Sequence, residues 1–114
     1  MSFQLRPSKV HGVGVFALKK IKKGTSLDLF AEEDYRYINK TEVKDKKMNR
    51  TLIKFYTIPD KTGYHAPKSF HRMSIGWYLN HSVTPNAYCN DDYEYFALKE
   101  IKGNEEITID YDKL

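Results

Sequence analysis

Short apolar stretches separated by turn residues run through most of the chain, and this pattern predicts a mainly β fold. The clearest case lies near the C-terminus, where Ile107 and Ile109 alternate with Thr108 and Asp110, so one face of a strand should be buried and the other solvated. Further strands are predicted at residues 3–9, 15–18, 27–31, 52–58, 64–66 and 93–98. The first contains Pro7 and is expected at a sheet edge, because proline cannot donate a ladder hydrogen bond.

Residues 41–54 break this pattern, because charged residues dominate and apolar ones are sparse. One short helix is predicted here, with Thr41 as its N-cap and Glu42 in its first turn. A basic solvated loop is the alternative. Residues 59–63 form a turn signal of Pro, Asp and Gly, so the strands on either side are expected to make a hairpin.

A short segment occurs twice. Residues 16–24 read FALKKIKKG, and residues 96–103 read FALKEIKG. Each copy predicts a strand, a turn anchored by one inward isoleucine and a glycine able to adopt a positive φ, at Gly24 and Gly103. Two equivalent arcs at the two ends of the chain predict a β architecture that closes on itself with approximate internal symmetry.

Length and composition narrow the class of protein. A chain of 114 residues is expected to be one domain. Its single cysteine, Cys89, cannot form an intrachain disulfide or a four-cysteine zinc site and is typical of a reducing compartment. His65 and His71 lack the partners that complete a zinc site, so no metal is expected. No signal peptide or membrane span is predicted, and the expected location is cytoplasmic, with a nuclear one left open.

The net charge of +4 comes largely from two lysine-rich clusters, at residues 19–23 and 40–54. Such clusters favour weak affinity for acidic surfaces or nucleic acid. Aromatic residues that could stack on bases do not accompany them, so solvated loop faces are the expected explanation and nucleic acid is not an expected partner.

Two segments are candidates for a site. Residues 77–86 read WYLNHSVTPN, a strand-like apolar lead-in followed by small polar residues and a turn at Pro85 and Asn86. Polar groups behind an apolar run must be satisfied, since each costs roughly 1–3 kcal/mol when buried and unpaired. A strand that ends in an Asn/Ser turn is the alternative. Gly12 and Gly14 would let the backbone approach a ligand closely, but a Rossmann fingerprint is incomplete because its third glycine is missing.

The pattern N-H-S-x-x-P-N at residues 80–86 resembles the central motif of the SET domain, the fold of most protein lysine methyltransferases. Residues 11–17, the arc that ends at Lys23 and Gly24, and E-I-x-x-D-Y at residues 106–111 resemble other motifs of this family in the correct order. The chain is therefore identified as a minimal member. The resemblance implies a single SET domain over residues 1–114: a β-clip of small curved sheets with a C-terminal pseudoknot, and a variable insertion at about residues 32–70 that carries one short helix.

The resemblance also implies a protein lysine N-methyltransferase that depends on S-adenosylmethionine. The backbone of His11, Gly12, Val13 and Gly14 would meet the methionine moiety of the cofactor. Asn80 would meet its ammonium group, and the His81 backbone the adenine edge. Tyr78 is either a further cofactor contact or a core aromatic.

Tyr111 corresponds to the catalytic tyrosine of the family. A phenol with a pKa near ~10 is mostly protonated at neutral pH, so its expected role is to orient the lysine amine rather than to act as a simple base. Tyr64, Tyr88 and Ile109 are the candidates for lining the substrate channel. The partner is a lysine-bearing protein or peptide, which could pair with an edge strand near residues 64–67.

The chain departs from the family pattern in three places. Trp77-Tyr78 replaces an Arg-Phe pair, residues 69–72 read SFHR where a Tyr-x-Gly motif is common, and the C-terminal flank that completes the channel is absent after Leu114. Either a second copy supplies that wall in a homodimer or the lid is incomplete. A non-catalytic β-clip module of the SAF type is therefore the alternative function.

Overall fold

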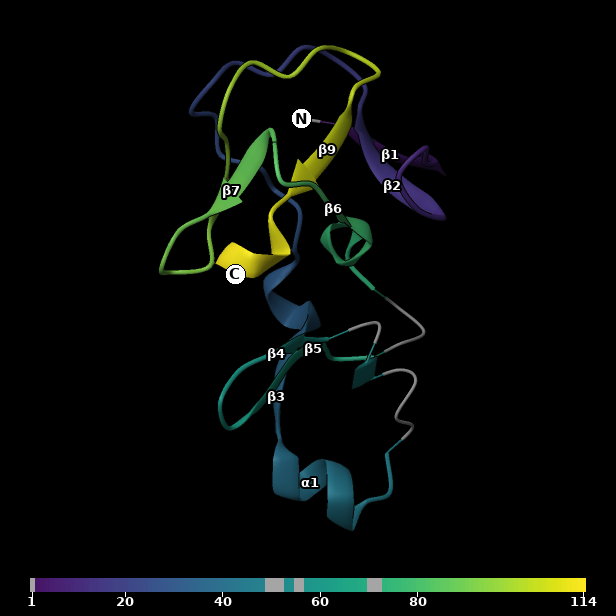
Figure 1. Cartoon of the computed structure of the whole chain (residues 1–114), viewed down its shortest axis with the longest axis vertical. Helices are drawn as coiled ribbons and strands as arrows, with labels where there is room; N and C mark the ends of the chain where they lie inside the picture. The colour runs from purple at the N-terminus through teal and green to yellow at the C-terminus, as the bar shows by residue number, and fades with distance from the viewer. Residues whose placement is uncertain (1, 49–52, 55–56, 70–72) are drawn as a thin grey trace. The chain divides into compact units, whose positions relative to one another are not determined.

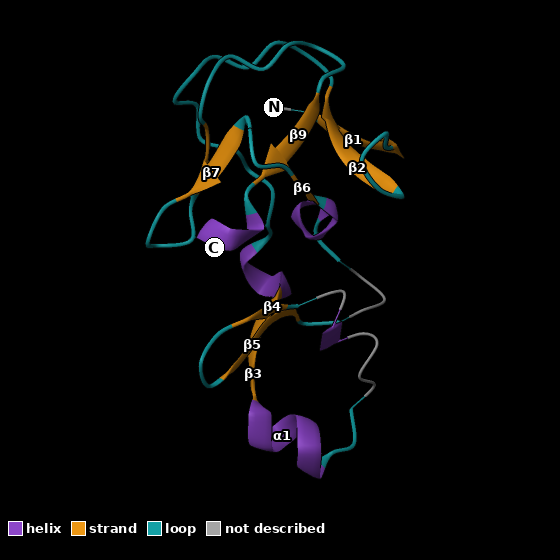
Figure 2. Cartoon of the chain, viewed as in Figure 1, coloured by secondary structure: helices purple, strands orange, loops and turns teal. Residues whose placement is uncertain are grey.

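The structure is a computed structural model that describes residues 2–48, 53–54, 57–69 and 73–114, and it is mainly β, with short helices (Figure 1, Figure 2). The chain divides into two compact units. Residues 1–29 and 78–114 form the first, here called the terminal unit, and residues 30–77 form the second, the inserted unit. The insertion predicted at about residues 32–70 lies within the second. No helix of the described residues is long and apolar enough to cross a membrane.

The terminal unit contains two sheets. The larger has the strand order β1-β2-β9-β6 and is formed by the strands β1 (Phe3–Pro7), β2 (Val13–Ala17), β9 (Glu106–Ile109) and β6 (Asn80–His81). Its strands pair antiparallel except for β6 and β9, which run parallel. The smaller sheet pairs β7 (Ala87–Cys89) with β8 (Tyr95–Ala97). The strand with Pro7 lies at the edge of its sheet, as predicted.

The two repeated arcs pair with each other. Ile21 and Ile101 exchange two backbone hydrogen bonds of 2.8 Å and both are buried, which confirms the inward isoleucines. Gly24 has the predicted positive φ of 83°, but the prediction for Gly103 is wrong. The positive φ of the second arc, 67°, belongs to Asn104, which has the same distance from Ile101 as Gly24 has from Ile21. Asparagine tolerates this conformation better than most residues with a side chain.

Two strand predictions in this part of the chain are wrong. Residues 27–31 alternate in burial like a strand, but the Leu29 N–H bonds the Leu27 carbonyl at 3.0 Å, and this tight turn ends the pairing. The lead-in to the N-H-S motif is not extended either, because Ile75–Tyr78 form the 3₁₀-helix η2. In both cases tertiary packing determines the backbone conformation, and the apolar pattern indicates only which side chains are fully or partly buried.

The inserted unit contains a three-stranded antiparallel sheet of order β3-β5-β4, formed by β3 (Tyr35–Asn39), β5 (Gly63–Pro67) and β4 (Ile58–Pro59). The 3₁₀-helix η1 (Glu32–Asp34) precedes it, and α1 (Lys40–Asp45) follows β3 directly. The predicted short helix therefore exists, but its N-cap is Asn39, whose side chain accepts the Glu42 N–H at 2.7 Å, and not Thr41.

The hairpin predicted from residues 52–66 is shorter than expected. Its first strand, β4, begins only at Ile58, whereas Ile53 and Lys54 are helical and residues 52, 55 and 56 lie outside the described residues. The return strand β5 is confirmed. Ile53 is buried, so its apolar character serves the core of the unit without strand geometry.

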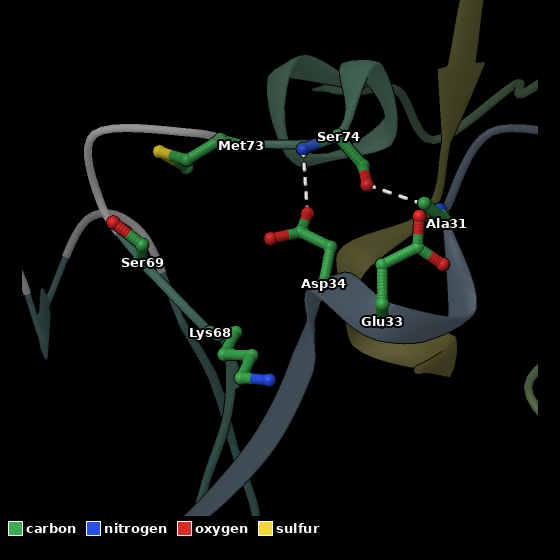
Figure 3. A pocket seen from close by; sticks show the side chains of 7 residues that line it. All are labelled: Ala31, Glu33, Asp34, Lys68, Ser69, Met73 and Ser74. Carbon is green, nitrogen blue, oxygen red and sulfur yellow. Dashed lines mark hydrogen bonds between the residues drawn. The ribbon is translucent and has the colours of Figure 1, made fainter.

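The two ends of the inserted unit are tied together by hydrogen bonds (Figure 3). The Asp34 carboxylate accepts the Ser74 N–H at 2.6 Å, and the Ser74 hydroxyl accepts the Ala31 N–H at 3.0 Å. Beside them the ring of Trp77 meets that of Phe30 edge-on, with centroids 5.2 Å apart. The segment therefore leaves and returns at one place, as an insertion requires.

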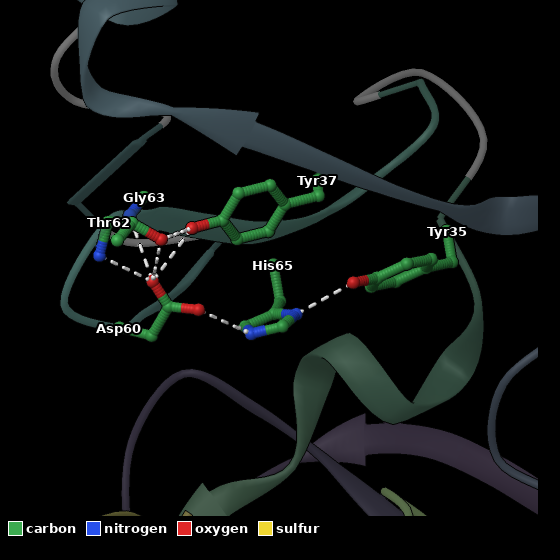
Figure 4. Close-up of polar contacts among 6 residues, drawn as sticks. All are labelled: Tyr35, Tyr37, Asp60, Thr62, Gly63 and His65. Atoms are coloured by element: carbon green, nitrogen blue, oxygen red, sulfur yellow. Dashed lines mark hydrogen bonds and ion pairs between the residues drawn. The ribbon is translucent and has the colours of Figure 1, made fainter.

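Asp60 organises the hairpin turn (Figure 4). One carboxylate oxygen accepts the N–H groups of Thr62 and Gly63 and the Tyr37 hydroxyl, each at 2.9 Å. The other lies 3.0 Å from Nε2 of His65. These contacts lower the pKa of Asp60 to about 2. The hydrogen bond from the Thr62 backbone is the largest cause of this decrease, and Tyr37, Gly63 and His65 make smaller contributions.

This turn should be sensitive to acid. Because the pKa of Asp60 is about 2 in the folded protein and 3.8 as the ordinary value, its contribution to stability is present above pH 3.8 and is lost as the pH falls through about 2. We expect thermal unfolding between pH 5 and pH 2, followed by circular dichroism, to show a shallower loss of stability in Asp60→Asn than in the unsubstituted protein. Asp92→Asn, on an exposed turn, is the control. An equally steep loss in Asp60→Asn would contradict the assignment.

Gly63 should tolerate no side chain. A Cβ there would collide with the Ile38 carbonyl and lie 2.7 Å from the Asn39 Cα, both backbone atoms of the paired strand β3. We expect Gly63→Ala to lower the free energy of unfolding by about 1–3 kcal/mol, measured by urea denaturation. Gly103→Ala is the matched control, since its nearest neighbour would be 3.5 Å away, and it should change stability by less than about 0.5 kcal/mol. Equal effects in the two variants would refute the steric explanation.

Candidate active site

The N-H-S segment lies beside the C-terminal motif. Strand β6 runs parallel to β9, with Asn80 opposite Thr108 and His81 opposite Ile109, and the Ser82 N–H extends the pairing to the Ile109 carbonyl at 2.9 Å (Figure 1). Parallel neighbours need a long connection between them, and here it is the chain from Val83 to Glu105. The two motifs that the sequence separates by about thirty residues therefore form one site, as the pseudoknot predicts.

Asn86 fastens this arrangement. Its side chain is 4% exposed; the amide nitrogen donates to the Glu106 carbonyl at 2.8 Å and the amide oxygen accepts the Thr108 N–H at 2.9 Å. One carboxamide thus satisfies two backbone groups of β9 as a neighbouring strand would. The sequence predicted only a turn at Asn86, although a polar residue that closes the motif directly after Pro85 was a usable signal.

Asn80 connects the motif to the glycine loop. Its side chain is 7% exposed, and Nδ2 donates to the His11 carbonyl at 3.0 Å and to a Glu106 carboxylate oxygen at 2.9 Å. The Val13 carbonyl lies 3.2 Å from the same nitrogen. The Glu106 carboxylate also accepts the Ser8 hydroxyl at 2.7 Å. Neither Glu106 nor Ser8 is among the predicted site residues. Glu106 opens the E-I-x-x-D-Y motif, which was a usable signal, whereas Ser8 has no such signal.

Glycine is required at the two positions of the loop for different reasons. Gly12 adopts a φ of +46°, which most residues with a side chain avoid. Gly14 is buried, and a Cβ there would lie 2.8 Å from the Glu106 Cδ and 3.1 Å from the Asn80 Nδ2. The close approach that the glycine pattern predicts is therefore made at Gly14 by Glu106 and Asn80 of the chain itself. Val13 between them is exposed at the start of β2.

Tyr111 begins the 3₁₀-helix η3 (Tyr111–Lys113), which Asp110 caps by accepting the Asp112 N–H at 3.0 Å. The Tyr111 hydroxyl donates to the Leu79 carbonyl, and its backbone N–H donates to Nδ1 of His81 at 3.0 Å. The two rings lie 5.2 Å apart. Burial raises the pKa of Tyr111, and the charge of Glu106 raises it further. The phenol is therefore a neutral donor at physiological pH.

The other predicted site residues occupy varied positions. Tyr78 is half-buried at the end of η2, and Ile109 is buried opposite His81. Tyr88 is 41% exposed on β7 and stacks on Phe96 with ring centroids 5.7 Å apart. Tyr64 belongs to the inserted unit and packs against its core cluster. Their roles in cofactor or substrate contact stay predictions.

Among the described residues, His81, Asp110 and Asp112 could bring three ligand atoms within 4.8 Å of one another. Other contacts explain this group, because Asp110 caps η3 and Nδ1 of His81 accepts the Tyr111 N–H. Its geometry is that of a helix cap.

Removing the carboxamide of Asn86 should loosen the threaded segment. We expect Asn86→Ala to lower the free energy of unfolding by about 2–4 kcal/mol, because two buried backbone groups of β9 lose their partners. Urea denaturation measures this. Val83→Ala, in the same loop but 77% exposed, should change stability by less than about 0.5 kcal/mol. A neutral effect of Asn86→Ala would mean that water replaces the carboxamide and that the pairing does not depend on it.

Comparison with known proteins identifies the family of the chain. The SET domain family model matches residues 12–112. A histone-lysine N-methyltransferase of Schizosaccharomyces pombe, specific for lysine 37 of histone H3, is 29% identical over 118 aligned residues, which cover 95% of this chain and 71% of that protein. The crystal structure of a Plasmodium falciparum protein proposed to be a histone methyltransferase is similar with a TM-score of 0.65 and 25% identity, over 96% of each chain. The chain therefore belongs to the SET domain family, the family of protein lysine methyltransferases that its threaded motif indicates.

Proposed function

We propose that this protein lysine methyltransferase takes its methyl group from S-adenosylmethionine, held by the loop at residues 11–14 and by Asn80 and His81, and that Tyr111 positions the substrate amine. The observation that carries the proposal is the parallel pairing of β6 with β9. It gathers the Leu79 carbonyl, His81 and Tyr111, while Asn80 ties the loop to the same place. A non-catalytic β-clip module would need none of these contacts.

The polar groups of the site fit the proposed cofactor. Nδ2 of Asn80 is committed to the loop and to Glu106, which leaves its amide oxygen as the polar atom able to accept a hydrogen bond from an ammonium group. The carboxylate of Glu106 adds negative charge directly behind Asn80 and Gly14. An ammonium group near this position would be stabilised by that charge, whereas an isolated anion would not.

When bound, S-adenosylmethionine supplies an electrophilic methyl group on a positively charged sulfur. The residues of the chain supply alignment, which is worth up to ~7–11 kcal/mol for well-oriented reactants. The Tyr111 hydroxyl donates a hydrogen bond to the Leu79 carbonyl. The lone pairs of the phenol oxygen therefore remain free to accept a hydrogen bond from an N–H of the substrate lysine. The lysine must lose its proton before it attacks, and a dry channel with a nearby positive charge lowers its pKa.

The substrate class follows in part from the relatives. The Schizosaccharomyces pombe protein acts on lysine 37 of histone H3, so core histones and a peptide around that lysine are the first acceptors to test. A cytoplasmic location and a homodimer also stay proposals.

Tyr111→Phe should separate catalysis from cofactor binding. We expect the transfer of a labelled methyl group from S-adenosylmethionine to core histones to fall by about 100-fold, because the substrate amine loses the oxygen that orients it. Calorimetric titration should show unchanged cofactor affinity. Asn80→Ala, in contrast, should weaken cofactor binding in the same titration. Tyr93→Phe, on an exposed turn, is the matched control. Full activity in Tyr111→Phe would remove this residue from the proposal.

The pH dependence of the rate should carry no descending limb from Tyr111. Because the pKa of Tyr111 is raised above its ordinary value of 10, its phenol stays protonated up to that pH, while the substrate amine becomes increasingly deprotonated. We expect kcat/KM to rise between pH 7 and pH 10. A decline in that range that disappears in Tyr111→Phe would show that the tyrosine ionises early and would contradict the assigned hydrogen bond.

A further inference from the structure

The net charge of the chain is concentrated in the inserted unit. Residues 30–77 contain ten Lys and Arg against six Asp and Glu, which gives +4, whereas the terminal unit contains nine of each and is neutral. Residues 40–54 alone hold six of the basic residues and two acidic ones. This separation gives the inserted unit a net positive charge, which favours acidic partners.

A groove of about 830 Å³ opens on this basic segment. Its rim carries Lys40, Lys44, Lys47 and Lys54. Lys40 and Lys44 stand one turn apart on α1, so their side chains share a face of the helix, and Lys47 follows where the chain turns with a φ of +48°. All four lysines are exposed.

The floor of this groove is apolar and belongs to the small core of the inserted unit. Val43, Met48 and Tyr64 are half-buried and pack against the buried cluster that contains Ile38 and Ile53. These three residues also line the groove and are less exposed than its lysines. The groove therefore offers an apolar seat with positive charge around it.

Three lysines of the rim, Lys40, Lys44 and Lys47, have no ion pair within the part of the chain that the structure describes. Lys46, the C-cap residue of α1, pairs with Glu42 at 3.5 Å. The ion pairs recorded for the described residues include none to Lys40, Lys44 or Lys47. Cations one turn apart on a helix repel each other, and an anionic occupant would remove that repulsion.

The floor decides which kind of anion fits best. A nucleic acid could pair its phosphates with the lysines, but stacking of bases needs exposed aromatic rings, and Tyr64 is the only aromatic residue in the lining that the structure describes. An acidic peptide can place a leucine or phenylalanine on the aliphatic floor and its carboxylates at the rim. This matches both the apolar and the charged parts of the groove.

We propose that this lysine-rimmed groove binds an acidic segment of a partner protein, with one or two apolar side chains seated on Val43, Met48 and Tyr64 and carboxylates beside Lys40, Lys44 and Lys47. The proposal goes beyond methyl transfer and does not depend on it. Cofactor and acceptor lysine are not needed for this binding, so it can succeed or fail independently of the proposed function.

The test is fluorescence polarisation of the full chain with a labelled synthetic peptide of about twelve residues in which leucines alternate with pairs of Asp and Glu. We expect saturable binding that weakens by about tenfold in Lys40→Glu with Lys44→Glu, because two rim charges are reversed. Lys23→Glu with Lys99→Glu is the matched control: it changes the net charge equally at exposed lysines of the terminal unit and should leave the affinity unchanged. Circular dichroism verifies that both double variants fold.

Two further probes distinguish between possible occupants of the groove. The same peptide with serine in place of each leucine should bind at least about fivefold more weakly, since it leaves the floor uncovered. A short labelled DNA duplex should bind more weakly than the acidic peptide. The proposal is overturned if the serine peptide binds as well, if both double variants lose affinity equally, or if the duplex binds more tightly through the same lysines. The last result would make the rim a nucleic-acid surface.

Discussion

The site depends on the pairing of the threaded segment with β9. The two residues of parallel β6 supply only a few backbone hydrogen bonds, which is little to hold this segment against β9. The carboxamide of Asn86 extends the pairing by two more bonds on the same strand, at Glu106 and Thr108. Because a buried backbone group without a partner costs roughly 1–3 kcal/mol, this single side chain makes withdrawal of the segment from β9 energetically unfavourable. The position of Tyr111 beside His81 follows from it.

Glu106 links this pairing to the glycine loop. It belongs to β9 through its backbone, while its carboxylate accepts hydrogen bonds from Ser8 and Asn80. The carboxylate occupies the space that a side chain at Gly14 would need. Glu106 therefore connects the two: its backbone bonds Asn86 of the threaded segment, and its carboxylate contacts Ser8 and Asn80 beside the loop. The candidate site and the net positive charge lie in different units: the terminal unit holds the site and is neutral, while the inserted unit carries the excess of basic residues.

Much of this could be predicted from the sequence, because it depends on local patterns. The alternation around Ile107 predicts β9, and the repeated arcs predict the inward positions of Ile21 and Ile101, although not their pairing with each other. Motif resemblance supplied the threading, which no periodicity could show. The sequence marks Glu106 and Asn86 only as motif positions. It could not predict their tertiary contacts, which are those of the Glu106 carboxylate with Ser8 and Asn80 and of the Asn86 carboxamide with β9. The strand expected at residues 27–31 fails for the same reason, since burial alternates there without ladder pairing.

The most direct measurement of the central claim is a nuclear magnetic resonance titration of the ¹⁵N-labelled protein with S-adenosylmethionine, observed at the backbone amides. If the threaded segment and the glycine loop form one cofactor site, the amide signals of Gly12, Gly14 and His81 should shift together along a single binding curve, while that of Gly63 in the hairpin of the inserted unit stays in place. Absence of any shift at millimolar cofactor, or shifts confined to the inserted unit, would contradict the account.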